Sequence, residues 1–595
     1  MKLYRTLRAC STLALLMAFS TAAPATDEFP ADDAILRALI DELGRSMTLQ
    51  LEDLSRPYFI QYSVEDTINQ RMSASYGALI GSDRDHSRTL YSNIRVGTHD
   101  LDNTNYRGGG GGFGGRRRGR GGGGRGGGAG GTALPLDDDY TALRQAIWRA
   151  SDRHYKGAVE TLTQKQAYME DKDLKDRPSD FTMSEPVKVY EPRETLKLER
   201  AAWEQRIRRI SARFLEHPHV QDSSVDLIAS DGRSYLVNSE GSRLIYGDTG
   251  VLLRISAQVQ AGDGEKLSDS LEYLVETPAE LPPIDEIISD VDDLARGLAR
   301  AMSCPVLEDY TGPVLFDEIA SAQMFEELLA RGVAGRVDPV GTQRRRFRGA
   351  QSLEKRLGKR ILPRSFQVYD DPREMKYGDT HLAGHYRYDD EGVAAERVDV
   401  VVDGKLVGMA MSRTPTKKLT GSNGHGRRTG RSATPQAAIG CLYIEARDGL
   451  GRPELKKALI EAAEEQGLEY GLRVTSLRGG GTGGAANIQA MIARLRRGAD
   501  GGLGDPIYVT RVYVADGHEE GVRGCEFGDI SIRTLREISA AGKERRVYNL
   551  TGGSRAGSSA SIIAPAVLFE EIDVARIEQE REKKPILAAP NTRPE

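Results

Sequence analysis

Residues 397–411 read RVDVVVDGKLVGMAM, and this stretch decides the kind of fold to expect. Two segments rich in apolar residues, 397–402 and 405–411, flank Asp403 and Gly404. Aspartate followed by glycine supplies the positive φ angles that a two-residue hairpin turn requires. The stretch therefore predicts a β-hairpin.

The rest of the C-terminal half carries the same mixture of elements. A helix is expected to begin at Pro453 and to end before Gly467, because proline is favoured in the first helical turn and glycine just past the last. A second hairpin is predicted at residues 507–514, closed by a turn with the Asp-Gly sequence. We therefore expect residues 312–580 to form a hairpin-rich α+β domain, followed by a flexible tail at 581–595.

The N-terminal half, residues 26–303, is expected to combine helices with an antiparallel sheet. Asp32 is the expected N-cap of a first amphipathic helix, whose apolar residues recur at three- and four-residue spacing. Asp231 and Gly232 predict a turn between two strands. The fold class is thus α+β throughout, with a domain boundary expected at residues 304–312.

The first 25 residues have the three regions of a secretory signal peptide. A basic start precedes an apolar stretch at residues 13–19, and small residues follow at Ala23 and Ala25. No other segment approaches the roughly 20 apolar residues that a membrane-spanning helix needs. We therefore expect a periplasmic or secreted protein without a transmembrane anchor.

Composition excludes several classes of protein. A net charge of −5 over 595 residues gives no global field that would indicate a nucleic-acid or membrane binder. Beyond the signal peptide only Cys304, Cys441 and Cys525 remain, without a CxxC pair, which excludes a disulfide-rich scaffold and a cysteine zinc knuckle. A single disulfide stays open.

Residues 107–131 are nearly all glycine with scattered arginines, including Arg116, Arg117 and Arg118. Such a stretch has no apolar groups to bury, so it is expected to be a disordered loop. Arginine-glycine segments bind RNA through charge and flexibility, but RNA is not an expected partner of an exported protein. A plain insertion and contact with a polyanion or the envelope surface are the two remaining interpretations.

Two further patterns have a structural interpretation beside a functional one. Gly479, Gly481 and Gly484 fit GxGxxG between a possible strand and a helix, the context of a dinucleotide site. The preceding segment alternates polar and apolar residues, whereas a parallel Rossmann strand is apolar throughout, which favours a surface turn. Residues 389–392 (DDEG) form an acidic turn that either binds a cation or is simply solvated.

The histidines and serines give weaker patterns. His381 and His385 would share a metal on a helix, but their surroundings favour an extended strand, on which four residues span about 13 Å. His217 and His219 would share one face of a strand, without a third ligand in the sequence. No GxSxG elbow accompanies the serines of the glycine- and serine-rich loop, so a serine hydrolase is not favoured. Those serines are Ser554, Ser558, Ser559 and Ser561.

Several short stretches, in order along the chain, together resemble the TldD/PmbA family of metallopeptidase-like proteins, specifically its secreted members with a long N-terminal half. They are RPYF at 56–59, residues 94–97 with 101–105, YLVNSEG at 235–241, GPVLF at 312–316, DDEGV at 389–393, SNGHGR at 422–427 and residues 564–573. The resemblance covers nearly the whole mature chain apart from the glycine- and arginine-rich loop.

The resemblance implies a metal site that this chain has altered. Metal-bearing members carry His-Glu-x-x-x-His on a helix after the GPVLF-like strand, with a cysteine nearer the C terminus. Without a gap, the motif falls on residues 326–331, so that Glu326 and Arg331 replace the histidines. Glu327 keeps the position of the glutamate, the general base that deprotonates a metal-bound water. Cys525 lies upstream of the expected cysteine, in whose region, residues 549–561, there is none.

Helix geometry favours a structural role for these residues. In a regular helix, residues five apart point about 140° away from each other, so two such ligands need a distorted helix. The family's usual glycine before the second histidine permits that distortion, whereas Ala330 favours a regular helix. Ala322, Phe325, Leu328 and Leu329 would then form an ordinary core stripe.

The resemblance implies proteolysis of unfolded or extended peptides by a complex that pairs a metal-bearing subunit with a relative lacking the motif. This chain resembles the latter, so we expect a metal-less subunit whose partner is an exported TldD-type protein. Two alternatives stay open: an active metallopeptidase with atypical zinc or iron ligands, and a stand-alone envelope- or polyanion-binding protein that uses the arginine-rich loop.

Overall fold

The computed structural model describes residues 29–51, 54–107, 131–193, 195–341, 352–428, 434–477, 503–551 and 559–577. Several predictions concern residues outside these ranges. They are the signal peptide, most of the glycine- and arginine-rich loop with Arg116, Arg117 and Arg118, the glycines of GxGxxG, Ser554 and Ser558, and the tail at 581–595.

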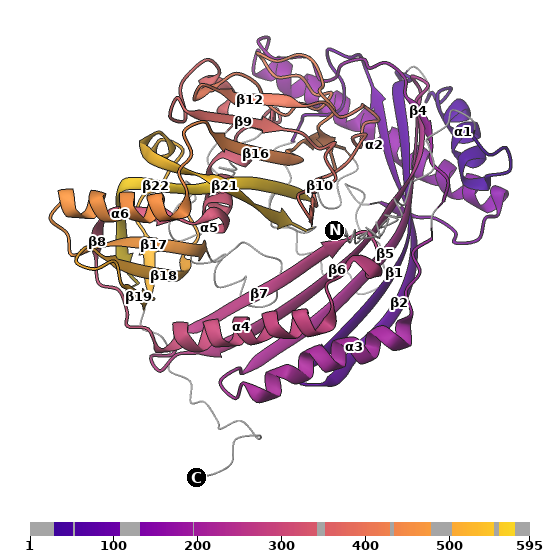
Figure 1. The fold of residues 1–595 in the computed structure, drawn as a ribbon. Coiled ribbons are helices and arrows are strands. Elements are labelled where there is room, and N and C mark those ends of the chain that lie inside the picture. The colour runs from indigo at the N-terminus through magenta and orange to yellow at the C-terminus, as the bar shows by residue number, and fades with distance from the viewer. Residues whose placement is uncertain are drawn as a thin grey trace, which may run out of the picture.

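Two β-sheets, one from each half of the chain, form the framework (Figure 1). Within the described residues the first sheet has seven strands, in the order β3-β2-β1-β5-β6-β4, with β7 also paired to β6. The strands are β1 Pro57–Ser75, β2 Ala78–Val96, β3 Thr132–Ala133, β4 Lys188–Tyr190, β5 Asp222–Asn238, β6 Arg243–Gln260 and β7 Lys266–Val275. All pairs are antiparallel except β4 with β6.

The turn predicted at Asp231 and Gly232 was wrong, because both residues lie inside the long strand β5. Gly232 is paired on both sides, with Thr67 of β1 and Asp248 of β6. A Cβ at this position would lie 2.5 Å from the carbonyl oxygen of Asp248. The glycine therefore permits close approach of two strands rather than a reversal of the chain.

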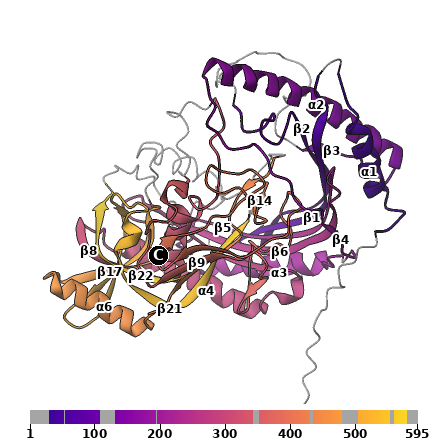
Figure 2. The ribbon, with the colours of Figure 1, turned by 90° about the horizontal axis from the view of Figure 1, so that it is seen from above.

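Helices cover the first sheet in two groups (Figures 1 and 2). α3 Arg200–Ala212 and α4 Ile284–Ser303 share an apolar core with β5, β6 and β7. α1 Ala34–Ser46 and α2 Tyr140–Asp171 share a second core with β1 and β2. The N-cap of α1 is Asp33 and not Asp32, since the Asp33 carboxylate accepts the N–H of Leu36.

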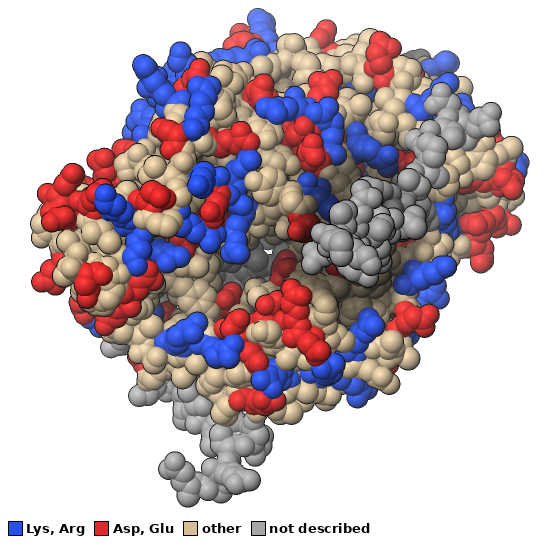
Figure 3. All heavy atoms as spheres, in the orientation of Figure 1, with Lys and Arg blue, Asp and Glu red and all other residues tan. Residues whose placement is uncertain are grey.

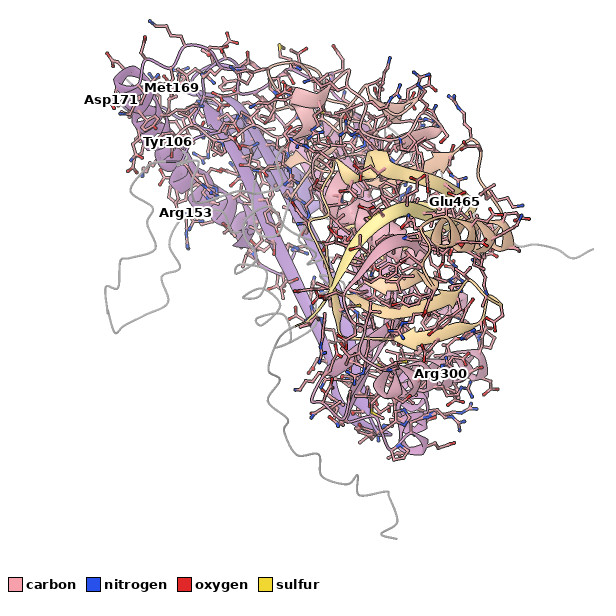
Figure 4. All side chains as sticks on the ribbon, turned by 90° about the vertical axis from the view of Figure 1, so that its left-hand side faces the viewer. Tyr106, Arg153, Met169, Asp171, Arg300 and Glu465 are labelled. Atoms are coloured by element: carbon pink, nitrogen blue, oxygen red, sulfur yellow. The ribbon has the colours of Figure 1, made fainter. Side chains whose placement is uncertain are left out.

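The two helix groups lie far apart. Arg153, Met169 and Asp171 of α2 and Arg300 of α4 are at opposite ends of the molecule in Figure 4. Short 3₁₀ turns lie at Arg213–Glu216, Pro278–Glu280, Leu353–Arg356 and Thr534–Glu537.

The second sheet has eleven strands in the described part of the chain, in the order β13-β12-β9-β16-β22-β8-β17-β18-β19, with β20 and β21 paired to β22. The strands are β8 Tyr310–Phe316, β9 Phe366–Asp370, β12 Val398–Val402, β13 Lys405–Leu406, β16 Cys441–Ala446, β17 Tyr470–Leu477, β18 Pro506–Tyr513, β19 Glu519–Val522, β20 Cys525–Phe527, β21 Ile538–Leu550 and β22 Ala560–Arg576. Two small pairs stand apart, β10 Lys376–Tyr377 with β11 Thr380–His381, and β14 Gly426–Arg427 with β15 Gln436–Ala437.

The hairpins predicted in the C-terminal half are confirmed. Asp403 and Gly404 have φ angles of 50° and 73° and connect β12 to β13. Gly517, with a φ of 70°, lies between β18 and β19. The predicted helix is α6, Arg452–Glu465, followed by Gly467 with a φ of 69°. The α+β fold class is confirmed as well.

The two halves are joined by buried polar contacts. Arg413, fully buried, donates from Nε and Nη2 to the carbonyl oxygen of Thr182 at 2.9 and 2.6 Å. Its guanidinium lies over the rings of Phe59 and Phe181, at 5.0 and 4.0 Å from their centroids. We call Arg413 with these partners the Arg413 clamp.

In the described ranges no helix has both the length and the apolar character needed to cross a membrane.

Candidate functional site

The residues that align with the family motif lie where helix α5, Glu318–Phe325, ends. β8 leads into this helix, and Ala322, Phe325 and Leu329 are fully buried in the core of the second sheet. Leu328 packs against the same core. The predicted core stripe is therefore confirmed.

The helix does not continue regularly, because Glu326–Ala330 forms a π turn. In a π turn the backbone hydrogen bonds span five residues, so side chains five apart come to the same side. The regular helix expected from Ala330 was wrong. Alanine is favoured over glycine in a helix by only about 1 kcal/mol, which is too little to fix the geometry of a buried segment.

Glu326 and Arg331 form an ion pair across the π turn, with 2.8 Å between Arg331 Nη2 and Glu326 Oε1. The Glu326 side chain is 10% exposed and that of Arg331 is 26% exposed. The two positions at which the resemblance places the family's histidines are thus brought together, and one ion pair occupies both.

Polar side chains surround the π turn. Glu327 Oε2 accepts the backbone N–H of Gly504 at 3.1 Å. Gln323 exchanges hydrogen bonds with the backbone of Leu477 in β17. Burial raises the pKa of Tyr548 in β21 to about 12, and the negative charges of Glu326 and Glu327 act in the same direction. Tyr548 therefore faces the π turn as a neutral hydroxyl.

The π turn lies close to the contact between the two halves. Glu272 of β7 also acts on the pKa of Tyr548. Just beyond β21, Thr551 Oγ1 accepts a hydrogen bond from Arg254 of β6 at 3.1 Å. Figure 3 shows a depression near the middle of the face in view. Sites between domains are common places for ligands to bind.

The residues present do not fit the zinc or iron of the family motif. Among the described residues, no group of three or more histidine, cysteine, aspartate and glutamate side chains is placed to hold a metal ion. The Glu326 carboxylate is paired with Arg331, whose guanidinium has no lone pair to donate.

The histidines have separate partners. His381, at the end of β11, bonds Glu280 at 2.7 Å, and His385 bonds the carbonyl oxygen of Pro372 at 2.9 Å. The extended strand predicted through both was wrong, because β11 ends at His381. His217 and His219 lie next to each other, with ring centroids 5.7 Å apart, but bond Asp292 and the Ala295 carbonyl oxygen respectively.

Ser561 has structural partners, and the three cysteines of the mature chain form no disulfide. Ser561 Oγ donates to Asn549 and accepts the N–H of Gly384. Cys304, Cys441 and Cys525 are all free, so they form no disulfide with one another.

Sequence reasoning missed the burial of the acidic turn, residues 389–392. The prediction of a solvated turn was wrong, since Asp389 is 0% exposed and Glu391 is 2% exposed. The turn packs against the SNGHGR stretch, where the N–H of Gly426 donates to Asp389 Oδ2 at 2.8 Å. The glycines of SNGHGR were the available signal, because a Cβ at Gly424 would lie 2.2 Å from the Ala394 carbonyl oxygen.

Comparison with known proteins identifies the second half of the chain. Residues 309–576 match the model of the PmbA/TldA metallopeptidase C-terminal domain. The second half of this chain therefore belongs to the TldD/PmbA family. It is 26% identical over 185 residues to metalloprotease slr0863 of Synechocystis sp., covering 31% of this chain and 36% of that protein. It is 36% identical over 165 residues to a metalloprotease of Archaeoglobus fulgidus, covering 28% and 35%. These alignments span about a third of each curated relative.

Solved structures of similar fold cover most of the chain. TldE from Thermococcus kodakarensis aligns with a TM-score of 0.55 and 14% identity over 91% of this chain and 100% of that one. A candidate modulator of a DNA gyrase from Thermotoga maritima aligns with a TM-score of 0.55 and 15% identity, over 87% and 96%. At this level of identity the similarity establishes the fold.

Proposed function

We propose that this chain is an exported, metal-free subunit of a TldD/PmbA-type peptidase complex that acts on unfolded or extended peptides. The ion pair between Glu326 and Arg331 carries the proposal. A permanently charged guanidinium at the position of one ligand repels a divalent cation, and it holds the carboxylate that would be the only remaining ligand. The general-base position, Glu327, is then left without a metal-bound water to act on.

Two further observations support the assignment. The second half of the chain belongs to a metallopeptidase family, and the resemblance implies complexes in which a metal-bearing subunit is paired with one that lacks the motif. The signal peptide in residues 1–25 favours export. A catalytic partner of this chain would then be exported as well.

The first experiment measures the metal content and the peptidase activity of the mature chain, purified from the exported protein fraction of the cells that produce it. We expect no stoichiometric zinc or iron and no cleavage of casein or unstructured peptides by the chain alone. Stoichiometric metal, with cleavage abolished by Glu327→Gln and retained in Glu318→Gln, would overturn the proposal in favour of an active peptidase with atypical ligands.

A second experiment tests the role assigned to the ion pair. The double variant Glu326→His, Arg331→His places two imidazoles at positions that the π turn brings together. We expect it to bind Co²⁺ more tightly than the natural chain, as measured by the visible absorption of the bound ion. Equal binding by the two proteins would show that residues 326 and 331 are not what excludes the metal.

A native pull-down from the envelope fraction tests the partner. Recovery of a metal-bearing TldD-type protein, with peptidase activity in the mixture, is the expected result. Recovery of polyanion alone, lost on deletion of residues 107–131, would instead favour the stand-alone binding protein.

A further inference from the structure

The acidic turn, residues 389–392, lies buried at the junction of the two halves. From the first half, Gln61 of β1 donates to the carbonyl oxygen of Asp390 at 2.8 Å. A Cβ at Gly392 would lie 3.1 Å from Leu236 of β5. From the second half, Glu391 contacts the backbone of Arg413 and Asp389 contacts the SNGHGR stretch. Two buried carboxyl groups two residues apart are costly unless both are fully hydrogen-bonded.

Asp389 has the partners that a carboxylate needs. Its Oδ1 accepts the backbone N–H groups of Glu391 and Val393, both at 2.9 Å, and its Oδ2 accepts that of Gly426 at 2.8 Å. Three N–H donors stabilise the charged form of a carboxyl group. Asp389 is therefore the better candidate of the two to stay ionised.

The Glu391 carboxyl group has fewer hydrogen-bond donors than that of Asp389. Its Oε2 accepts the N–H of Arg413 at 2.6 Å, but its buried Oε1 finds no hydrogen-bond partner among the described residues. A Cβ at Gly426 would lie 2.3 Å from Oε2, so the carboxyl group is tightly enclosed. An ionised group in this position would be poorly solvated, whereas a neutral carboxylic acid is much cheaper to bury.

The cations near Glu391 bond other groups, although Arg413 Nη1 and Arg95 Nε and Nη2 have no hydrogen-bond partner among the described residues. The Arg413 side chain donates to the Thr182 carbonyl oxygen and, at 2.7 Å, to Glu240 Oε1. Arg95 of β2 donates to Asp102 at 2.7 Å. Neither guanidinium hydrogen-bonds the Glu391 side chain among the described contacts, although both charges act on it.

We propose that Glu391 holds a proton in the folded chain and that its loss loosens the Arg413 clamp, so that the junction between the two halves is stronger in acid than in base. Once ionised, Glu391 competes with Thr182 and Glu240 for the Arg413 guanidinium. The clamp side chain is then drawn towards the second half and away from its partners in the first.

The titration of this cluster supports the same direction. Burial raises the pKa of Glu391 to about 7, and the charge of Asp389 adds to the rise. Burial also raises the pKa of Asp389 to about 6. A pKa raised by folding contributes stability that is full below the ordinary value of about 4.5 and is lost as the pH rises through the folded value. His425, whose pKa is raised by Asp370 and Asp389 against the effect of burial, contributes in the same direction.

The test compares the full mature chain with Glu391→Gln, a substitution that keeps the size of the side chain. Urea unfolding is measured at about pH 5 and about pH 8. The unfolding equilibrium constant of the natural chain should rise between these values by at least roughly tenfold more than that of the variant, since each pKa unit corresponds to a factor of ten. Asp389 and His425 titrate in both proteins, so the difference between the two pH dependences reports the substitution at Glu391.

Asp390→Asn is the matched control within the same turn. Burial alone would raise the pKa of the Asp390 carboxyl group. The positive charges of Arg428 and Arg427 outweigh this effect and hold the pKa below the ordinary value for an aspartate. This variant should keep the alkaline loss of stability. Equal alkaline slopes for the natural chain and Glu391→Gln would overturn the proposal.

A second measurement does not depend on how well the variant folds. Infrared spectra of the natural chain in slightly acidic buffer should show the carbonyl band of a buried protonated carboxyl group, which disappears as the pH rises. Hydrogen exchange at Thr182, whose N–H donates to the Arg413 carbonyl oxygen at 2.9 Å, should accelerate over the same range. The absence of this band in the natural chain would contradict the assignment. So would hydrogen exchange at Thr182 whose rate, after correction for the intrinsic pH dependence of exchange, does not change with pH.

Discussion

Replacing Arg331 by methionine tests how the π turn is held. The substitution keeps much of the aliphatic stem but removes the cation, leaving the carboxylate of Glu326 10% exposed and without its partner. Breaking a fully buried pair costs about 3–5 kcal/mol, and an exposed pair is worth about 0–1 kcal/mol. With side chains 10% and 26% exposed, this pair lies between the two limits, and we expect a loss of about 2 kcal/mol.

The assay is urea unfolding of the natural chain, Arg331→Met, Glu326→Gln and the double variant, which together form a mutant cycle. The double variant should recover most of the stability lost in Arg331→Met, because no charge is then left unpaired. Lys457→Met is the control: Lys457 pairs with Glu461 on α6, with both side chains more than half exposed, and should cost less than about 0.5 kcal/mol. Equal costs for Arg331→Met and Lys457→Met, or no recovery in the double variant, would refute the reasoning.

Three further predictions use the same unfolding assay. Gly384→Ala should cost about 3 kcal/mol, because the new Cβ would lie 2.1 Å from the carbonyl oxygen of Gly440. Gly157→Ala on α2, where nothing lies within 4 Å of the new Cβ, should instead stabilise the chain by up to about 1 kcal/mol. Equal effects of the two substitutions would contradict this prediction. Burial would raise the pKa of Glu280, but hydrogen bonds from Lys376 and His381 lower it to about 2. The contribution of Glu280 to stability is therefore present above about pH 4.5 and is lost as the pH falls towards 2. Glu280→Gln should reduce this loss of stability in acid, and an unchanged loss would count against the prediction. Arg413→Leu should cost about 3 kcal/mol, because it leaves the partly buried Glu240 carboxylate and the Thr182 carbonyl oxygen without their partner. A loss below about 1 kcal/mol would show that the clamp does not stabilise the junction.

Local rules predicted those elements whose determinants are adjacent in the sequence. The turn at Asp403 and Gly404 needs only two residues able to adopt positive φ angles, and α6 needs only a proline at its start and a glycine after its end. The same rules failed at Gly232, where the glycine is required by strands that are distant in the sequence. A pattern of turn residues does not reveal which of these two demands a glycine meets.

The position of the candidate site stays a prediction from the resemblance, and its geometry was not predicted. The alignment of residues 326–331 with the family motif located Glu326 and Arg331, and their opposite charges are evident in the sequence. That they pair depends on a π turn, which neither helix propensity nor spacing indicates. The burial of Glu391 was likewise unpredictable, because the groups that enclose it, such as Gly426 and Arg413, come from separate stretches of the chain.

The ion pair across the π turn has a consequence for how such sequences change over evolutionary time. If either residue is replaced alone, the other is left as a partly buried charge, so positions 326 and 331 are constrained to covary. Among homologues, histidine at one position should accompany histidine at the other, and glutamate should accompany arginine, with mixed pairs depleted. A search for relatives by histidine spacing passes over the second group, whereas an acidic residue followed five positions later by arginine, at the end of a short buried helix, would find it.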